Sequence, residues 1–206
     1  TTEQNALEFA AINQTLFGIA VNVNLRNALQ SAQGLVSGSE AAADMPSMPR
    51  AFYAAAIAGF VQGGSANANW KMLTGAAGDE TKQVNICRRT NGSGTQASSN
   101  LFFAEAATIG SDVNGMLFPK TATGALAING TLAVLEGSGT GNVESCLTSA
   151  TLGSTGYAMG VVSYEVDPGT KAYRFVKIDG AAPDKALARI GGYPFVYSAS
   201  MQYKKT

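Results

Sequence analysis

The segment of residues 84–103 holds the residue types and spacing in this chain that are best suited to binding chemistry. An apolar run of strand length ends in Arg88 and Arg89, and the string Gly92-Ser93-Gly94-Thr95 then precedes a helical pattern. Glycines let the backbone approach a ligand closely, and free N–H groups at a helix start favour negative charge. An arginine can bind two oxygens of a tetrahedral anion, and hydroxyl groups add donors. The pattern indicates either an oxyanion site or a tight turn and helix cap beside a surface arginine pair.

Composition and spacing exclude several enzyme chemistries. The chain has no histidine, which excludes Ser-His and Cys-His nucleophile pairs and histidine-ligated zinc. Ser93 and Ser138 both lack the glycine two residues earlier that a nucleophile elbow requires. The sequence also contains no Gly-Lys pair for a phosphate P-loop. We therefore expect no enzyme activity, no cofactor and no metal site.

A dinucleotide-binding fingerprint is matched only loosely, by Gly92, Gly94 and Ala97. That fingerprint requires an acid about 20 residues further on for the ribose. Glu105 and Asp112 lie off this spacing, and two arginines directly before the glycines are unusual for the motif. The sequence therefore favours a simple anion over a dinucleotide.

The overall composition is that of a folded domain without a strong electrostatic field. Of the 206 residues, 46% are hydrophobic and 14% are charged, which argues against disorder. Lys+Arg and Asp+Glu both number 14, so no basic surface is expected to bind nucleic acid or an anionic membrane. No apolar run approaches the ~20 residues of a membrane span.

The N-terminus and the two cysteines bear on where the protein resides. The sequence opens with Thr1-Thr2-Glu3, as a mature exported protein or a clipped fragment would. Cys87 and Cys146 are the only cysteines, and they are either a disulfide or two buried free thiols. A disulfide would require Cα atoms ~4.4–6.8 Å apart. We favour the disulfide, and with it a periplasmic or extracellular location.

Alternating strand and helix patterns predict an α/β fold, with a mostly parallel sheet flanked by helices. Apolar runs of strand length predict strands at residues 17–23, 83–87, 132–135, 156–166, 172–178 and 192–203. Helical spacing predicts helices at residues 25–35, 50–60 and from near 94 to about 107, with a short helix or irregular lead-in at 5–17. We expect Phe52, Tyr53, Phe60 and Trp70 to be core residues rather than ligand contacts.

A second glycine-rich string, Gly137 to Asn142, allows two interpretations. It could add backbone donors to the same cleft, or it could form a flexible turn. We favour the turn because we expect no Arg or Lys nearby, and because Glu136 and Glu144 would repel an anion.

The strand followed by R-x-x-G-S-G-T resembles the ligand loop of the periplasmic phosphate-binding proteins of ABC importers. This resemblance implies a type 2 periplasmic-binding-protein-like fold, in which Arg89, Ser93 and Thr95 hold phosphate and Gly94 offers a backbone donor. Asn91 and Gly92 complete the implied ligand loop. Other stretches resemble the family in the same order over roughly residues 15–203: NWKML after residues 50–69, then GYAMGVVSYE and GGYPFVYSASMQY.

Two departures from the family pattern limit what the resemblance implies. Asn91 stands where the family usually has an acid that orients the arginine and accepts a proton from phosphate. The first lobe, which supplies the other half of the phosphate cage, has no counterpart upstream of Phe17. We therefore expect one lobe with its crossing strands: residues 1–24 as lead-in and crossing strand, 25–166 as the ligand-loop lobe, and 167–206 as returning strands and tail.

The resemblance implies an exported solute-binding protein that captures a tetrahedral oxyanion, phosphate, for the permease of an ABC importer. The alternative is a structural, self-associating extracellular protein that has this fold without ligand transport. Crossing strands at 17–23 and 192–203 would lack their first lobe and would leave apolar faces and unpaired edges. We therefore expect these strands and residues 1–16 to contact a missing N-terminal fragment or an identical subunit.

Overall fold

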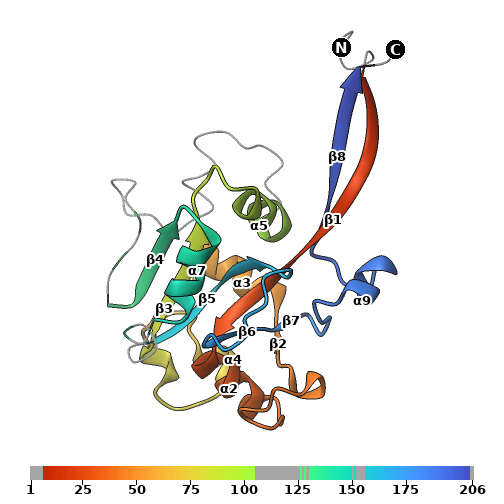
Figure 1. The fold of residues 1–206 in the computed structure, drawn as a ribbon. Helices are drawn as coiled ribbons and strands as arrows, with labels where there is room; N and C mark the ends of the chain where they lie inside the picture. The colour runs from red at the N-terminus through yellow and green to blue at the C-terminus, as the bar shows by residue number, and fades with distance from the viewer. Residues whose placement is uncertain are drawn as a thin grey trace.

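The computed structural model describes residues 7–104, 126, 128, 130–149, 151 and 156–204. Its main sheet has the strand order β4-β3-β5-β1-β6, and β8 pairs with the outer part of β1 (Figure 1). The strand β3 is parallel to both β4 and β5, whereas β1 is antiparallel to its neighbours. The strands are β1 (Leu7–Asn22), β3 (Gln83–Arg89), β4 (Leu132–Gly137), β5 (Gly156–Ser163), β6 (Tyr173–Phe175) and β8 (Val196–Lys204).

Two hydrophobic clusters lie on opposite faces of this sheet, as strand alternation requires. Ile19 and Val21 of β1 belong to the larger cluster, and Ala20 between them belongs to the smaller one. The larger cluster packs against α2 (Val23–Ala32), α3 (Arg50–Ile57) and residues of α5 (Gly94–Ala104). The smaller cluster includes Val143 and Leu147 of α7 (Thr140–Leu147). The predicted α/β fold with helices flanking the sheet is confirmed, and β4, β3 and β5 form the parallel part of that sheet.

Short elements complete the chain around this core. The two-stranded sheet of β2 and β7 is parallel. These elements are η1 (Ala42–Asp44), β2 (Ser47–Met48), α4 (Lys71–Thr74), η2 (Asp79–Thr81), β7 (Lys177–Ile178) and α9 (Lys185–Arg189). In the described part of the chain, no helix has the length and apolar character needed to cross a membrane.

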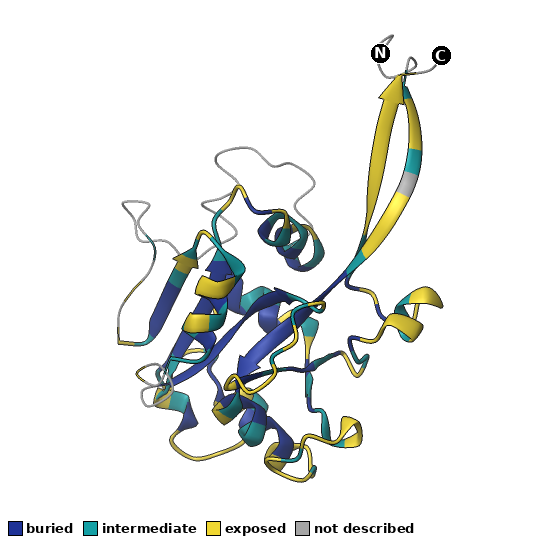
Figure 2. Cartoon of the chain, in the orientation of Figure 1, coloured by how far each residue is buried: buried dark blue, intermediate teal, exposed yellow. Residues whose placement is uncertain are grey.

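The outer half of β1 and β8 form a two-stranded antiparallel ribbon that projects from the lobe (Figure 1). The prediction of a helix or irregular lead-in at residues 5–17 is therefore wrong for the described residues 7–17. The unpaired edges expected for the strand at residues 17–23 are also wrong for β1, because Phe17–Val21 pair with β5 on one side and Ala20–Asn22 pair with β6 on the other. Most of the ribbon is exposed (Figure 2), including Phe9, Ile12, Met201 and Tyr203.

The aromatic core predictions hold for three of the four residues. Phe52, Tyr53 and Trp70 are buried, and the Trp70 ring lies 5.6 Å from that of Phe52. Phe60 is 74% exposed, so its assignment to the core is wrong. The helix α3 ends at Ile57, and Gly59 adopts a φ of 85°, which turns the chain so that the Phe60 N–H bonds to the Ala55 carbonyl. The side chain of Phe60 therefore leaves the apolar face of the helix.

Cys87 and Cys146 form a disulfide with a Cα–Cα distance of 5.8 Å. The predicted bridge and its spacing are confirmed. Cys87 is a buried residue near the end of β3, and Cys146 lies on α7. The bond therefore fixes α7 to the strand that leads into the glycine-rich loop.

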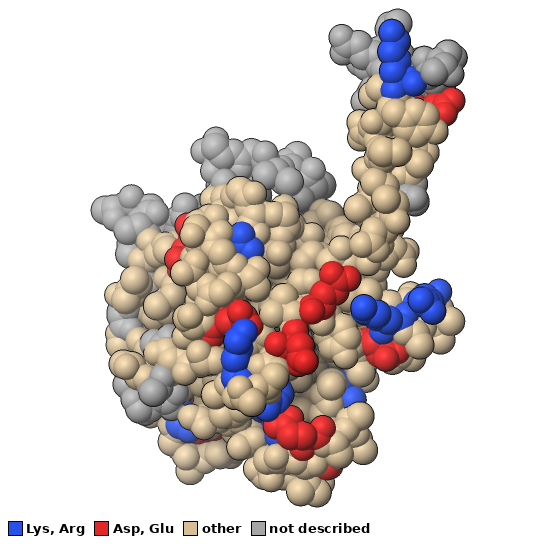
Figure 3. All heavy atoms as spheres, in the orientation of Figure 1, with Lys and Arg blue, Asp and Glu red and all other residues tan. Residues whose placement is uncertain are grey.

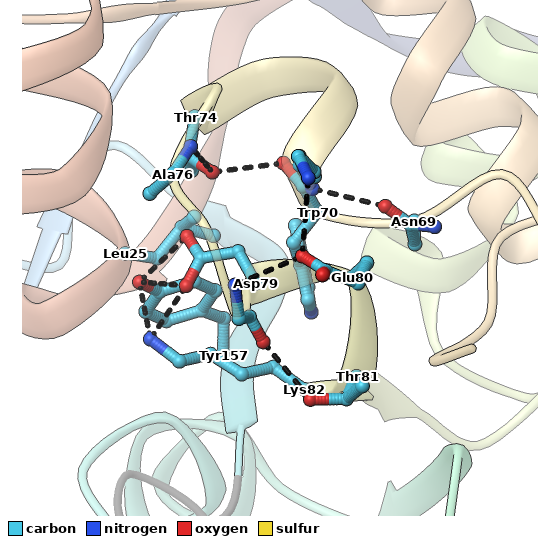
Figure 4. A network of polar contacts seen from close by, with 12 residues as sticks. Leu25, Asn69, Trp70, Thr74, Ala76, Asp79, Glu80, Thr81, Lys82 and Tyr157 are labelled. Atoms are coloured by element: carbon cyan, nitrogen blue, oxygen red, sulfur yellow. Dashed lines mark hydrogen bonds and ion pairs between the residues drawn. The ribbon is translucent and has the colours of Figure 1, made fainter. Parts of the chain in front are cut away.

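A polar network around Asp79 ties η2 to the sheet (Figure 4). Lys82 Nζ lies 2.8 Å from Asp79 Oδ1 and donates to the Tyr157 hydroxyl at 2.7 Å. That hydroxyl donates to Asp79 Oδ2 at 3.1 Å. Burial alone would raise the pKa of Asp79, but hydrogen bonds from Lys82, Thr74 and Tyr157 outweigh it and lower the pKa. Asp79 is therefore an ionised, 3% exposed carboxylate that the fold depends on.

We predict that Asp79→Asn lowers the free energy of unfolding at neutral pH by about 1.5–3 kcal/mol, since hydrogen bonds to a charged group are lost. Because the folded-state pKa lies below the ordinary value of 3.8, this stabilisation is present above that value and is lost as the pH falls through the folded pKa. The difference from the parent should therefore shrink towards pH 3. Urea unfolding at both pH values measures it, with Glu8→Gln on the exposed ribbon as the control. An equal loss at both pH values would contradict the prediction.

Candidate functional site

The glycine-rich loop lies where β3 ends and α5 begins, at the carboxyl edge of the parallel strands. Such edges are where ligands bind in open α/β sheets. The Ser93 N–H donates to the Thr90 carbonyl at 3.0 Å, and the Ser93 carbonyl accepts from the Ala97 N–H at 2.9 Å. Ser93 is therefore the residue that precedes the first turn of α5, and it is 8% exposed. The N–H groups of the first turn of α5 have no acceptor within the helix.

The side chain of Gln96 links the end of β3 to α5 beneath the glycine-rich loop. Its side-chain oxygen accepts from the Arg89 N–H at 3.1 Å, and its side-chain amide donates to Asn100 Oδ1 at 2.9 Å. Gln96 is 5% exposed, so its bond to Asn100 is buried and its bond to Arg89 is partly buried. The last residue of β3 is thereby tied to the first turns of α5, which fixes the width of the loop between them.

The two arginines at the end of β3 face opposite sides of the sheet, because strand side chains alternate. Arg88 is 4% exposed, and its guanidinium lies 2.5 Å from Glu136 on β4. Burial lowers the pKa of Arg88, and Glu136 only partly offsets this. Arg89 instead donates to the Thr140 hydroxyl at 3.1 Å and to the Ser138 carbonyl at 2.8 Å. Arg88 thus forms a structural ion pair with Glu136, whereas Arg89 lies beside the glycine-rich loop.

A cavity of about 510 Å³ opens between this loop and the base of the ribbon. Its loop side consists of Arg89, Gly92, Ser93, Gly94, Thr95 and Ser98. Its ribbon side consists of Thr15, Phe17, Tyr197, Ser198 and Ala199. Arg89 is the only charged residue among these described lining residues. The cavity is therefore a positive, hydroxyl-rich pocket, which is the kind of surroundings an oxyanion requires.

The structure brings together five of the six residues that the sequence singled out. Arg89, Gly92, Ser93, Gly94 and Thr95 all line the cavity, whereas Asn91 is exposed and does not. Arg89 is held by Thr140 and Ser138, and it makes no hydrogen bond or ion pair with Asn91 among the described residues. Whether these residues bind a ligand stays a prediction.

Sequence reasoning did not find the other hydroxyl groups of the cavity. Ser98 follows Gly94 by four residues, so helical spacing alone places it on the same side of α5. Thr15 and Ser198 enter from strands far away in sequence, and no local signal indicates them.

The second glycine-rich string lies closer to the cavity than its sequence suggests. Gly137 ends β4, and α7 begins at Thr140, so the string does form a turn. The expectation that no basic residue lies near it is wrong, because Arg89 contacts both Ser138 and Thr140 across parallel strands. Glu136 is paired with Arg88, and Glu144 lies 2.6 Å from Lys171, so neither acid is left unneutralised. The string therefore positions Arg89 without repelling an anion.

We predict that Gln96→Ala lowers the free energy of unfolding by about 1–3 kcal/mol, because the buried Arg89 N–H loses its acceptor. Amide hydrogen exchange should show faster exchange at Arg89 than in the parent, since the loop closure is lost. Thr81→Ala, at an exposed residue far from the loop in the fold, provides a control for the measurement. Unchanged protection of the Arg89 amide in Gln96→Ala would contradict the assigned role of Gln96.

Comparison with known proteins places this geometry in a recognised fold. No protein-family model matches the chain, and no curated protein matches its sequence. A phosphate ABC transporter substrate-binding protein with bound phosphate from Clostridium perfringens aligns at a TM-score of 0.55 and 17% identity, over 98% of this chain and 61% of that one. An ABC-type phosphate transport receptor from Vibrio cholerae aligns at 0.56 and 16% identity, over 98% and 62% of the two chains. PstS from Borrelia burgdorferi aligns at 0.56 and 12% identity, over 98% and 63%.

At these identities the likeness establishes the fold, and this chain spans less than two thirds of the length of the solved proteins. The implied fold is confirmed. The chain has the periplasmic-binding-protein fold of the phosphate ABC transporter substrate-binding proteins, over about three fifths of their length.

Proposed function

We propose that this chain binds a tetrahedral oxyanion, phosphate, in the cavity between the glycine-rich loop and the ribbon. It would do so as the exported solute-binding component of an ABC importer, in the periplasm or outside the cell. The observation that carries the proposal is the convergence of Arg89, Ser93 and the start of α5 on one cavity whose described lining contains no acid. The bound phosphate of the Clostridium perfringens protein, which has the same fold, supports this choice of anion.

The donors of the cavity suit an anion with several oxygens. A guanidinium has five N–H groups, and Arg89 uses two of them, on Thr140 and Ser138. Its Nε is buried and has no hydrogen-bond partner in the described structure, so a donor is left over. Ser93, Thr95 and Ser98, which carry hydroxyl groups, line the same space as Gly94 at the start of α5, where N–H groups have no acceptor within the helix. Charge-assisted bonds from these groups can surround an oxyanion from the loop side.

The absence of an acid from the described lining residues bears on which oxyanion binds. A carboxylate would accept a proton from phosphate and would repel sulfate, which carries none. Asn91 does not line this cavity, and hydroxyl oxygens are the side-chain hydrogen-bond acceptors among its described lining residues. We therefore propose that the site discriminates weakly between phosphate and sulfate.

The ribbon supports a further part of the proposal. One wall of the cavity belongs to the ribbon, whose outer residues Phe9, Ile12, Met201 and Tyr203 are 44–64% exposed. Since the solved proteins with this fold are longer, we propose that a further lobe, on flanking sequence or a separate chain, covers the ribbon and completes the site.

The second candidate function, self-association without transport, rests on the same exposed strands, which favour pairing with an identical subunit.

Isothermal titration calorimetry with phosphate and with sulfate tests the proposed function. We predict that Arg89→Ala weakens the binding of both anions roughly 10- to 150-fold, the equivalent of about 1.5–3 kcal/mol for one charge-assisted contact. Arg189→Ala, an exposed arginine of α9 that does not line the cavity, is the matched control and should bind as the parent does.

Because Arg89 also contacts Ser138 and Thr140, thermal unfolding should establish that the Arg89→Ala variant is folded. Ser98→Ala is a second variant, which removes one hydroxyl group from the cavity and leaves these contacts in place. A parent that binds neither anion, or an Arg89→Ala variant that binds both as tightly as the parent, would overturn the proposal.

Light scattering on the same samples tests the second candidate function, self-association. A species of about twice 21.1 kDa without anion binding would favour self-association.

A further inference from the structure

A second cavity, of about 360 Å³, lies between α2, residues 39–46, residues 164–168 and β6, and we call it the α2–β6 cavity. It shares no lining residue with the cavity at the glycine-rich loop. Its size falls in the range of small-molecule sites in proteins. Acidic and basic side chains lie close together on this face of the molecule, over α2, β6 and α9 (Figure 3).

Apolar side chains line one part of the α2–β6 cavity. Tyr164 and Phe175 meet edge to face with ring centroids 5.2 Å apart, and Met45, Pro46 and Pro168 extend this apolar surface. Phe175 lines the cavity and is 7% exposed, so its ring is held in place by the surrounding core. An apolar group of a ligand would therefore find a preformed surface.

An ion-pair triad forms another wall. Glu40 accepts from Arg26 Nη1 at 2.6 Å and from Arg174 Nε at 2.8 Å, so two guanidiniums share one carboxylate. Arg26 is 4% exposed, and its Nε has no hydrogen-bond partner among the described residues. The triad therefore carries a net positive charge beside the apolar surface.

The other charged residues that line the cavity form no ion pairs with one another among the described residues. Arg174 Nη1 donates to the carbonyls of Lys171 and Tyr173, while its Nη2 has no partner in the described structure. Lys185 and Glu165 are exposed and have no ion pair among the described residues. Asp167 accepts only from the N–H of Gly169 at 2.9 Å. Donors from Arg174 and Lys185 and acceptors from Glu165 and Asp167 thus stand around one apolar surface.

We propose that the α2–β6 cavity binds a small zwitterion, an α-amino acid with an apolar side chain. The free Nη2 of Arg174, with Lys185, binds the α-carboxylate, because a guanidinium matches a carboxylate in geometry and charge. Glu165 and Asp167 bind the α-ammonium group, and the side chain packs on Tyr164 and Phe175. A simple anion such as phosphate is disfavoured by the two acids, and an amine alone is disfavoured by the positive triad.

The proposal is tested by titrating the whole chain with L-phenylalanine, followed by amide NMR and calorimetry. The comparison ligands are 3-phenylpropionate, which lacks the ammonium group, and 2-phenylethylamine, which lacks the carboxylate. We expect L-phenylalanine to bind with a Kd of about 1 mM or tighter, and each comparison ligand to bind at least about fivefold more weakly. The affected amides should lie around residues 164–168 and 174–175. Saturating phosphate should not compete, since the two cavities share no residue.

Variants separate ionic recognition from simple apolar binding. Glu165→Gln should weaken the binding of L-phenylalanine at least threefold without weakening that of 3-phenylpropionate, whereas Lys185→Gln should weaken the binding of both. Both residues are exposed and unpaired, so the fold should tolerate the changes, and Arg189→Gln on the same helix as Lys185 is the matched control. The proposal is overturned by the lack of saturable L-phenylalanine binding, by equal affinity for all three ligands, or by unchanged affinity in both variants.

Discussion

The register of β3 between β4 and β5 is the constraint on which the candidate site depends. Parallel pairing places Arg89 beside Gly137, and this brings the second glycine-rich string within reach of the Arg89 guanidinium. The disulfide from Cys87 to Cys146 then fixes α7, whose first residue is Thr140, against the same strand. A shift of β3 by one residue would exchange the sheet faces of Arg88 and Arg89. Arg89 would then be buried beside β4, and Arg88 would lie beside the loop.

The second organising feature is β1, which belongs to two different structures along its length. Its inner half lies in the middle of the sheet, bonded to β5 and β6, and is fully buried around Ile19 to Val21. Its outer half pairs only with β8 and is mostly exposed. The residues at the junction, Thr15 and Phe17, line the cavity, so the site lies where the lobe gives way to the ribbon. A cover that binds the ribbon would therefore also close the site.

Much of the lobe could be predicted from sequence because its signals are local. Branched apolar runs mark β3, β4 and β5, and the change to helical spacing after Gly94 marks α5. The glycine-rich loop was found for the same reason, since strand, arginine, glycines and hydroxyls all lie within a few residues. The structure places five of those six residues on one cavity.

The features that sequence did not indicate depend on contacts between distant residues. Residues 7–16 have apolar spacing that fits a helix, and only pairing with β8, over 180 residues away, makes them a strand. The contact of Arg89 with Ser138 and Thr140 depends on the pairing of β3 with β4, and the Arg26–Glu40–Arg174 triad joins α2 to β6. Phe60 was misplaced because a single glycine, Gly59, ends the helix before the periodic pattern does.

The most direct measurement of the central claim is an amide NMR titration of the chain with phosphate, with the Arg89 Nε–H observed in the same spectra. If the loop binds the anion, the N–H resonances of Gly94 and Thr95 and the Arg89 Nε–H shift together and saturate at one common Kd. If these resonances stay in place at saturating phosphate, or shift only together with residues remote from the loop, the cavity at the start of α5 is not an oxyanion site.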